Sequence, residues 1–395
     1  MQKYQILGKK GEGTFSEVLC AQNIKTQQYV AIKCMKKAFK SKEQVNRLRE
    51  IQAVRRLQPH PNIVDLVEVL FDRSAGRLAL VLELMDMNLY ELIKGRKQYL
   101  SEEKVRGYMY QLLKGLDHAH RIGVFHRDIK PENLLVDAEG RLKIADFGSC
   151  KGIYSKQPLT EYISTRWYRA PECLLTDGYY NYKMDLWSAG CVFFEIIALF
   201  PLFPGSNELD QVHRIHNVLG TPPADVLDRL KKFGTHMDYD FPQKQGTGLA
   251  KLLPHVSAEA LDLMKKLLTY DEEHRCTAKE ALRHPYFCKL READKKTRRF
   301  KHSASLYRPV ATAAATDDAH NPTTLSTSPR KYTNVVTSLN STLTTSRKLP
   351  VIDGVSPTKS GTFTTNHSTV HPIHGGLATS ASGEDLNARS LPKLL

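Results

Sequence analysis

Short apolar runs of β-strand type alternate with turn residues through the first hundred residues. The runs are β-branched or alternate between apolar and polar residues, and they predict five strands, over 4–7, 17–21, 29–33, 63–71 and 78–82. Between the third and fourth runs, apolar residues recur at helical spacing in a charged background, at Val45, Leu48, Ile51, Val54 and Leu57. This spacing predicts one amphipathic helix. The first lobe is therefore expected to be mainly sheet.

Helical spacing takes over after residue 100. Ser101 suits an N-cap, the two glutamates after it suit the positive end of a helix dipole, and an apolar stripe runs from Val105 to Leu116. The same spacing predicts further helices over 184–199, 208–219, 258–268 and 278–283. The second lobe is expected to be mainly helical.

The composition changes sharply near residue 290. From about residue 303 the chain is dominated by Ser, Thr, Asn, Ala and Pro, and such a segment buries too little apolar surface to offset its ordering entropy. We therefore expect a folded region over 4–287, with lobes over about 4–84 and 88–287. A basic linker and a disordered Ser/Thr-rich tail are expected over 288–395.

The charge balance raises the question of nucleic-acid binding, because 57 Lys and Arg face 42 Asp and Glu, a formal net charge of +15. A nucleic-acid binder would show a basic stripe interleaved with aromatic residues, or a recognisable binding module. The chain shows neither. Its one dense basic cluster, 295–302, is explained equally well by a solvated linker and by a nuclear-import signal. We expect no nucleic-acid partner.

The cysteines and the longest apolar stretch argue against a disulfide-rich, zinc-binding or membrane-spanning protein. Seven cysteines, an odd number without a C-x-x-C pair, argue against a disulfide framework or a zinc site and fit a reducing compartment. The stretch 188–203 is interrupted by Glu195 and Pro201 and is shorter than the ~20 apolar residues that cross a bilayer, so it predicts a buried helix. The first residues hold no apolar run of signal-peptide length, and we expect neither secretion nor a membrane partner.

Two motifs in the first lobe are suggestive of phosphate binding. Between the first two strands lies G-E-G-T-F-S-E-V, Gly11 to Val18. Its glycines would let backbone N–H groups approach phosphate oxygens. An ordinary glycine-bearing hairpin explains the same residues about as well. The sequence V-A-I-K ends a strand at Lys33, and Glu50 on the predicted helix could pair with it. A solvated strand end is the competing interpretation of Lys33.

The decisive segment is F-H-R-D-I-K-P-E-N-L-L, Phe125 to Leu135, followed by K-I-A-D-F-G, Lys143 to Gly148. It supplies a carboxylate for a hydroxyl nucleophile and an amide and a carboxylate for Mg²⁺, at Asp128, Asn133 and Asp146. Turn or capping roles alone would not produce the full set of motifs in this order and spacing.

These motifs resemble those of eukaryotic protein kinases over about Tyr4 to Phe287, with A-P-E ending at Glu172 and an arginine, Arg275, where the family pairs one with that glutamate. The segment 160–172 resembles a MAP-kinase activation lip, and P-L-F-P-G-S-N-E-L-D-Q fits the group that contains MAP kinases and cyclin-dependent kinases. Within that group the chain is similar to the male-germ-cell-associated and intestinal-cell kinase family. The resemblance implies an α+β, bilobal fold.

The resemblance also implies roles for individual residues. Asp128 corresponds to the catalytic-loop aspartate, and Lys130 to a lysine that contacts the transferring phosphate in serine/threonine kinases. Asn133 and Asp146 correspond to the metal ligands, and Leu82 to the residue that controls the back pocket. The implied ATP site comprises Lys10, Gly11, Glu12, Gly13, Thr14, Phe15, Ser16, Glu17, Val18, Ala31, Lys33, Glu50, Glu83, Met85 and Leu135. Ser16 departs from the pattern, which has a third glycine there.

Regulation and substrate choice follow from the same resemblance. Phosphorylation is expected at Thr160 and Tyr162. The cations expected to pair with the phosphates are Arg49, Arg127 and Lys151 around Thr160, and Arg166 and Arg169 near Tyr162. Arg169 is also expected to shape a pocket for the residue after the acceptor, which would favour Ser-Pro and Thr-Pro sites.

The implied partners are protein substrates, an upstream kinase and a phosphatase, for a monomeric enzyme that uses ATP and Mg²⁺. The segment 40–50 does not resemble a cyclin-binding helix, so no cyclin is expected. The expected location is cytoplasmic and possibly nuclear, with the cilium suggested by family resemblance alone. A catalytically silent pseudokinase scaffold is the alternative, although Lys33, Asp128 and Asp146 are all present.

Overall fold

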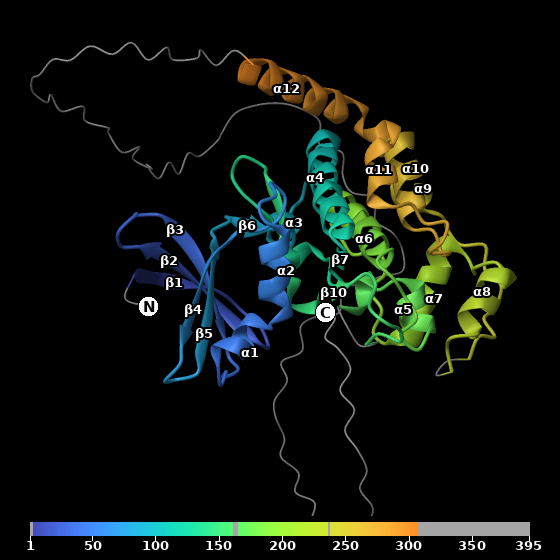
Figure 1. The fold of residues 1–395 in the computed structure, drawn as a ribbon. Helices are drawn as coiled ribbons and strands as arrows, with labels where there is room; N and C mark the ends of the chain where they lie inside the picture. The colour runs from blue at the N-terminus through green and yellow to red at the C-terminus, as the bar shows by residue number, and fades with distance from the viewer. Residues whose placement is uncertain (1–2, 161–164, 236–237, 307–395) are drawn as a thin grey trace, which may run out of the picture. The chain divides into compact units, whose positions relative to one another are not determined.

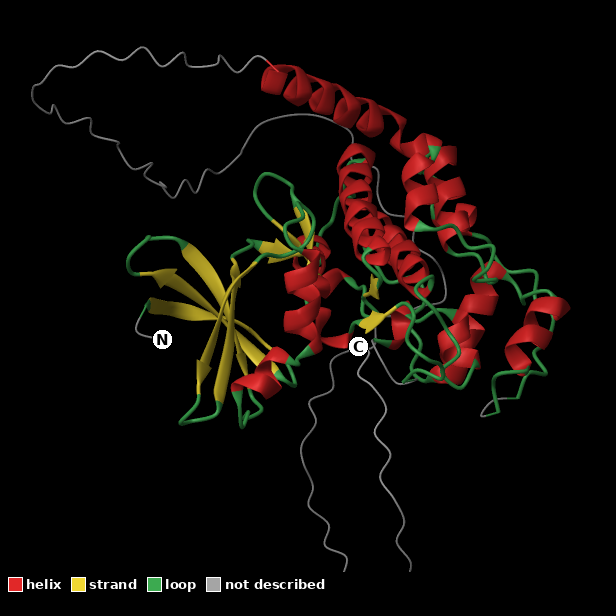
Figure 2. Ribbon diagram, in the orientation of Figure 1, coloured by secondary structure: helices red, strands yellow, loops and turns green. Residues whose placement is uncertain are grey.

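The computed structural model describes residues 3–160, 165–235 and 238–306. Its first lobe is built on a five-stranded antiparallel sheet with the order β1-β2-β3-β5-β4 (Figures 1 and 2). The strands are β1 (Tyr4–Glu12), β2 (Ser16–Asn23), β3 (Tyr29–Met35), β4 (Leu66–Asp72) and β5 (Arg77–Glu83). All five predicted strands are confirmed. The fourth begins three residues late because Ile63 bridges Ile144 of the second lobe instead of joining the sheet.

The single amphipathic helix predicted between β3 and β4 is wrong in one respect, because the structure divides it into α1 (Lys42–Asn46) and α2 (Arg49–Leu57). Leu48 takes an extended conformation and serves as the N-cap of α2. The apolar residues keep their helical spacing on both sides of the break, but they pack in two different cores. Val45 and Ile51 pack against β5, whereas Leu57 joins the core of the second lobe.

Helices dominate the second lobe, as predicted. They are α3 (Leu89–Ile93), α4 (Glu102–Arg121), α5 (Pro171–Leu175), α6 (Met184–Ala198), α7 (Glu208–Leu219), α8 (Ala224–Lys231), α9 (Leu249–Leu252), α10 (Ala258–Leu267), α11 (Ala278–Arg283) and α12 (Cys288–Leu306). The predicted helices correspond to α4, α6, α7, α10 and α11, whereas the sequence did not predict α3, α5, α8 and α9. Ser101 caps α4 by accepting a hydrogen bond from the backbone N–H of Lys104. Every residue of α6 is buried, which confirms that the longest apolar stretch is a core helix. Among the described helices, none has the length and apolar character to cross a membrane.

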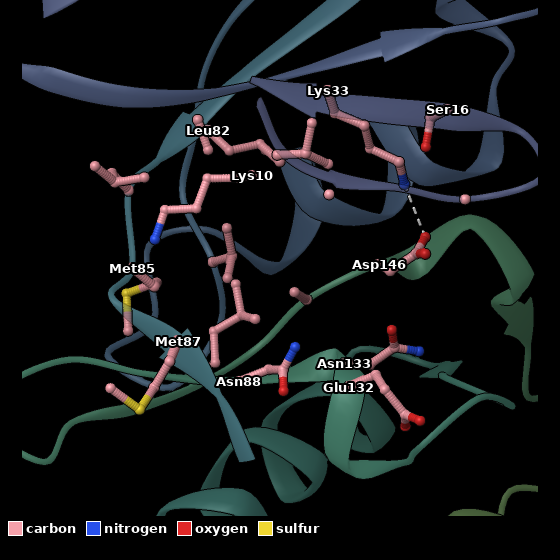
Figure 3. Close-up of a pocket in the computed structure, with 18 of the residues that line it drawn as sticks. Lys10, Ser16, Lys33, Leu82, Met85, Met87, Asn88, Glu132, Asn133 and Asp146 are labelled. Atoms are coloured by element: carbon pink, nitrogen blue, oxygen red, sulfur yellow. Dashed lines mark hydrogen bonds and ion pairs between the residues drawn. The ribbon is translucent and has the colours of Figure 1, made fainter. Parts of the chain in front are cut away.

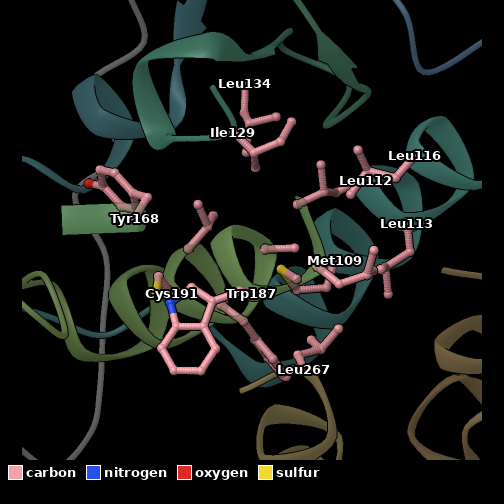
Figure 4. Close-up of a cluster of buried hydrophobic side chains, with 14 of the residues drawn as sticks. Met109, Leu112, Leu113, Leu116, Ile129, Leu134, Tyr168, Trp187, Cys191 and Leu267 are labelled. Carbon is pink, nitrogen blue, oxygen red and sulfur yellow. The ribbon is translucent and has the colours of Figure 1, made fainter. Parts of the chain in front are cut away.

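The core of the second lobe lies between α4, α6 and α10 (Figure 4). Leu112 and Leu116 of α4 face the same cluster as Trp187 of α6 and Leu267 of α10, and all four side chains are fully buried. Ile129, from the segment that carries Asp128, also lies in this cluster. The catalytic-loop motif is therefore anchored directly in the largest apolar core of the molecule.

Two small sheets hold the motif segments in place, and the sequence did not predict them. One joins β6 (Met87–Asn88), β8 (Leu134–Val136) and β9 (Leu142–Ile144), and the other pairs β7 (Val124–Phe125) with β10 (Lys151–Gly152). Strands of two or three residues are too short to show periodicity in the sequence. Strands β8 and β9 overlap the two motif segments and pair with each other, whereas β7, which includes Phe125, pairs with β10 after the second motif.

Beyond residue 287 the chain continues as α12, where the sequence predicted a linker. Asp294 on this helix accepts hydrogen bonds from Tyr110 at 3.0 Å and Lys114 at 3.4 Å, both on α4. Arg291 donates to the backbone carbonyl of Leu282 at 3.1 Å. These contacts with other helices could not be foreseen from a charged local sequence. The predicted tail from residue 307 onward lies outside the described residues.

Candidate active site

A cavity of about 520 Å³ lies between the sheet of the first lobe and the catalytic-loop segments of the second (Figure 3). Twelve of the predicted ATP-site residues line it, namely Lys10, Gly11, Glu12, Gly13, Ser16, Val18, Ala31, Lys33, Glu50, Glu83, Met85 and Leu135. Thr14, Phe15 and Glu17 are not part of its wall. Phe15 is 78% exposed at the tip of the β1–β2 loop, and Glu17 follows Ser16 on a strand whose side chains alternate between faces.

Lys33 joins three elements at the inner end of this cavity. Its Nζ lies 2.7 Å from Glu50 Oε1 on α2. It also lies 2.9 Å from Oδ1 of Asp146, which follows β9, and Figure 3 shows this second contact. Lys33 is on the central strand β3, where it is 9% exposed. The predicted Lys33–Glu50 pair is therefore present, and the contact with Asp146 links both lobes to one ammonium group.

The charges of this group of three residues are strongly interdependent. Burial acts to lower the pKa of Lys33, but the carboxylates of Glu50 and Asp146 outweigh burial and raise that pKa. Burial raises the pKa of Glu50, with partial opposition from Lys33. Burial also acts to raise the pKa of Asp146, which Lys33 nevertheless holds below its usual value. Both shifts favour the charged forms, a cationic Lys33 and an anionic Asp146.

Lys130 and Asn133 of the catalytic loop line the cavity, whereas Asp128 is not part of its wall but contacts both of them. Asn133 donates from its side-chain amide to the backbone carbonyl of Asp128 at 2.8 Å and to Asp128 Oδ2 at 2.9 Å. Lys130 Nζ lies 3.0 Å from the same Oδ2 and donates to Thr165 Oγ1 at 3.2 Å. The other carboxylate oxygen of Asp128, Oδ1, is buried and has no hydrogen-bond partner among the described residues.

The N-terminus of α6 fixes the backbone of the catalytic loop. The fully buried carboxylate of Asp185 accepts hydrogen bonds from the backbone N–H groups of His126 at 2.8 Å and Arg127 at 2.9 Å. Arg127 has φ 68°, a left-handed conformation that is unfavourable for a residue with a side chain. The two hydrogen bonds to Asp185 stabilise this conformation and with it the position of Asp128.

Asp146 is held by a similar arrangement. It also has a left-handed backbone, with φ 60° and ψ 70°. The ring of His126 hydrogen-bonds through Nε2 to the backbone carbonyl of Ala145 at 2.9 Å and packs edge-on against buried Phe147. A Cβ on Gly148 would come within 3.1 Å of Asp146 Oδ1, so a side chain at that position would crowd the carboxylate.

The connection between the lobes, residues 83–88, forms the far wall of the cavity. Glu83 accepts a hydrogen bond from Lys143 Nζ at 2.5 Å and another from the backbone N–H of Asp65 at 2.7 Å. Lys10 on β1 reaches across the mouth and donates to the backbone carbonyl of Asp86 at 2.8 Å. Leu82, the expected back-pocket residue, also lines the cavity. These contacts hold the connection against both lobes.

Eight lining residues were missed by the sequence prediction. They are Val64, Leu84, Asp86, Met87, Asn88, Glu91, Glu132 and Ala145. Half of them are next to a predicted site residue in the sequence, so these could have been predicted as its neighbours. Val64 had no such signal, because it reaches the cavity through contacts with a distant segment, the bridge of Ile63 to Ile144 and a hydrogen bond from its own backbone N–H to the Ile144 carbonyl at 3.0 Å.

The expected cation cluster around Thr160 is partly assembled. Arg127 donates to the hydroxyl of Tyr180 at 2.9 Å, and that hydroxyl donates to the backbone carbonyl of Thr160 at 2.6 Å. Arg127 also donates to the backbone carbonyl of Ser149 at 2.7 Å, and the thiol of the next residue, Cys150, lies 3.9 Å from the backbone carbonyl of Arg49. Lys151 follows Cys150 directly. Tyr162 lies outside the described residues.

Two further arginines of the predicted set make ion pairs or hydrogen bonds in the second lobe. Arg166 donates to the backbone carbonyl of Ser206 at 3.0 Å, and buried Arg169 pairs with Glu208 at 3.0 Å. The predicted pair between Glu172 and Arg275 is present, with distances of 2.6 and 2.8 Å and both side chains essentially inaccessible.

Comparison with known proteins identifies the class of molecule to which this site belongs. The model of the protein kinase domain matches residues 4–287. The chain belongs to the protein kinase family. The kinase is 58% identical over 296 residues to the human MAPK/MAK/MRK overlapping kinase, which covers 75% of this chain and 70% of that relative.

Two other relatives define the group more broadly. The kinase is 42% identical over 287 residues to the rat serine/threonine-protein kinase ICK, covering 73% of this chain and 45% of the relative. It is also 42% identical to cyclin-dependent kinase F-3 of Oryza sativa subsp. japonica, covering 73% of this chain and 65% of the relative. The chain is therefore a protein serine/threonine kinase of the MAK, ICK and cyclin-dependent-kinase-like group, with protein substrates.

Proposed function

We propose that the kinase transfers the γ-phosphoryl group of ATP to serine or threonine hydroxyls at the cavity described above. One observation carries this proposal, namely the buried carboxylate oxygen Asp128 Oδ1, which has no partner among the described residues. A buried acceptor without a donor is costly. A substrate hydroxyl that donates to this oxygen would satisfy it and would be oriented for attack.

Mg²⁺ fits the oxygen donors at the lower edge of the cavity. Asn133 directs its amide NH₂ toward Asp128, which leaves the amide oxygen for a cation. Asp146 supplies a carboxylate that Lys33 holds in the charged form. Mg²⁺ prefers such hard oxygen ligands and, when bound, neutralises charge on the triphosphate. We infer that Asn133 and Asp146 are its protein ligands.

Phosphoryl transfer passes through a loose transition state, so the protein contributes mainly positioning and charge neutralisation. Lys33 would bind the α- and β-phosphates while Glu50 keeps its ammonium group in place. Lys130, which lies 3.0 Å from Asp128, would contact the phosphoryl group as it moves. Val18, Ala31 and Leu135 would enclose the adenine, with backbone groups of Glu83 and Met85 as its hydrogen-bond partners.

The direct test is transfer of labelled γ-phosphate from ATP and Mg²⁺ to a generic basic protein by the full chain. Asp146→Asn should lower the rate by at least ~10²-fold, comparable to losing one preorganised electrostatic group. Asp117→Asn, which removes a carboxylate paired with Arg121 on the surface of α4, is the matched control and should leave the rate unchanged. Activity of Asp146→Asn within threefold of the wild type would contradict the metal assignment, and an inactive wild type would favour the pseudokinase alternative.

We further propose that the kinase is proline-directed. Arg169 is buried and paired with Glu208 beside the segment that would receive the substrate. If this arrangement leaves the backbone N–H of the following residue without a partner, proline is favoured because it has no N–H. An unpaired buried donor costs ~1–3 kcal/mol, so kcat/KM should differ by roughly five- to 150-fold between peptides that carry Pro or Ala after the acceptor. A ratio near one would contradict the preference and leave the kinase activity intact.

Activation by phosphorylation of Thr160 and Tyr162 is part of the same proposal. The path from Arg127 through Tyr180 to the Thr160 carbonyl supports it for Thr160. We also propose a monomeric, cytoplasmic or nuclear enzyme. One relative is named a cyclin-dependent kinase, so the absence of a cyclin partner remains a prediction.

A further inference from the structure

Ser16 begins β2 at the phosphate end of the cavity, where the kinase pattern has a third glycine. Alternate side chains of a strand share one face. Ser16 and Val18 both line the cavity, whereas Glu17 between them does not. In the pairing of β2 with β3, Val18 lies opposite Lys33 and Ser16 lies opposite Met35. Ser16 is therefore on the same face of β2 as Val18 but closer to the loop between β1 and β2.

The side chain of Ser16 points into the cavity. Figure 3 shows its hydroxyl directed from the strand toward the end of the cavity that holds Lys33 Nζ and Asp146. Within the described parts of the chain, no residue forms a hydrogen bond with this hydroxyl. The Ser16 carbonyl is engaged, because it accepts a hydrogen bond from the backbone N–H of Gly13 at 2.8 Å. That hydrogen bond closes the tight turn and holds the backbone from which the hydroxyl projects.

We propose that the Ser16 hydroxyl donates a hydrogen bond to a β- or γ-phosphate oxygen of the bound nucleotide. The inference rests on the proposed function, since it assumes that ATP binds in this cavity. A hydroxyl is a donor that glycine lacks, and hydrogen bonds to anionic oxygens are the stronger kind. Ser16 is then a phosphate-binding residue that supplements the backbone N–H groups of the loop.

A purely conformational role for Ser16 makes a different prediction. A residue with a Cβ restricts the backbone relative to glycine, so Ser16 could act only by stiffening the loop. In that case Ser16→Ala, which keeps the Cβ, would behave like the wild type. If the hydroxyl itself binds phosphate, Ser16→Ala and Ser16→Gly lose the contact, whereas Ser16→Thr keeps it.

The test is equilibrium binding of ATP, ADP and adenosine to the full chain with Mg²⁺ present, measured by titration calorimetry. Ser16→Ala should weaken ATP binding by about three- to tenfold, the effect of one lost hydrogen bond to a charged group. Its affinity for adenosine, which has no phosphate, should stay within twofold of the wild type, and Ser16→Thr should restore most of the ATP affinity. Thr26→Ala, which removes a hydroxyl at the turn between β2 and β3, is the matched control and should change none of these values.

Each outcome bears on the proposal. A loss that appears with both ADP and ATP assigns the contact to the β-phosphate, and a loss with ATP alone assigns it to the γ-phosphate. Unchanged ATP affinity in Ser16→Ala, or equal losses for ATP and adenosine, would overturn the inference. Failure of the wild-type chain to bind ATP would instead overturn the proposed function, so the two failures are distinguishable.

Discussion

A carboxyl group in the core of the second lobe couples the protonation of a single residue to the stability of the protein. Glu195 on α6 is buried and accepts a hydrogen bond from the Tyr168 hydroxyl at 2.7 Å. Burial raises the pKa of Glu195 to about 7, with the Tyr168 bond opposing this shift and Glu132 adding to it. The folded protein therefore binds a proton at Glu195 over a pH range in which the unfolded chain has lost it.

The sign of the effect follows from proton linkage. Between the ordinary pKa of glutamate, 4.5, and about 7, the folded state binds more protons at this site than the unfolded state. The free energy of unfolding therefore falls as the pH rises through that range. A shift of this size corresponds to roughly 3 kcal/mol at most.

We expect Glu195→Gln to remove this pH dependence. Glutamine keeps an oxygen that accepts from Tyr168 but cannot ionise, so the Tm of the variant relative to the wild type should increase from pH 5 to pH 8. Thermal unfolding at pH 5, 6, 7 and 8 checks this. Glu273→Gln on the surface is the control and should follow the wild type. Parallel curves for Glu195→Gln and the wild type would contradict the assignment.

The sequence was informative about the polar residues of the site and silent about residues such as Glu195. Lys33, Asp128, Asn133 and Asp146 occur in motifs whose spacing identifies them. Glu195 was visible only as an interruption in an apolar run. Its role depends on the Tyr168 hydroxyl, 27 residues away along the chain, and on burial that only packing produces.

At the scale of elements, a buried ion pair joins α5 to the segment before α11. Glu172 and Arg275 form a two-pronged contact, and Arg275 also donates to the backbone carbonyls of Thr269 and Tyr270 and lies over the ring of Trp187. Removal of one partner of a buried pair leaves the other charge uncompensated. Substitution of either Glu172 or Arg275 alone should therefore destabilise the protein.

We expect Glu172→Gln to lower the free energy of unfolding by about 3–5 kcal/mol. Arg275→Met should cost at least as much, because three sets of contacts are lost with the guanidinium group. The double variant should be less destabilised than the sum of the single variants, since neither charge is then left alone. Urea unfolding of the four proteins measures this coupling, and strict additivity would show that the pair is not the cause.

Helix α12 is one of the elements that the sequence did not predict, and its contacts make it a structured part of the second lobe. Leu290 packs against the main core, and Asp294 and Arg291 make hydrogen bonds to other helices. A chain shortened to end at 306 should therefore keep its stability and activity. A chain ending at 287 should lose these contacts, worth about 2–4 kcal/mol together.

For a protein of this size such a loss corresponds to a Tm lower by about 5 °C. Thermal unfolding of the two shortened chains and the full chain provides the comparison. Equal Tm values for the chains ending at 287 and 306 would show that α12 contributes nothing to the second lobe. Inactivity of the chain ending at 306 would show that the predicted tail is needed.

At the scale of the whole molecule, both lobes meet at Lys33, which contacts Glu50 and Asp146, and we expect the activity to depend on this contact. Glu50 comes from α2 of the first lobe, and the cations expected around Thr160 come from α2, the catalytic loop and β10. Phosphate on Thr160 adds about −1.5 to −2 charge at the point where these segments meet. The added charge would draw them together and position α2 with Glu50.

We expect phosphorylation of Thr160 and Tyr162 to raise kinase activity by about tenfold or more, which corresponds to the ~1.4 kcal/mol or more that new charge-assisted hydrogen bonds provide. The comparison is between phosphatase-treated and untreated enzyme, with the modification verified by mass spectrometry. Thr160→Val should respond less to the treatment than the wild type. Equal activity of the treated and untreated enzyme would refute this mode of activation.

The sequence alone determined the class of the molecule, the five strands of the first lobe, helices α4, α6, α7, α10 and α11 of the second lobe, and most of the polar residues of the site. It did so because strand and helix periodicities and the spacing of motifs are local properties. The tertiary structure decided what local patterns cannot carry, such as the break before α2, the docking of α12 and the protonation of Glu195. It also brought Lys33 to Asp146, 113 residues away. Contacts between distant segments depend on how the cores pack, and that packing is a property of the whole fold.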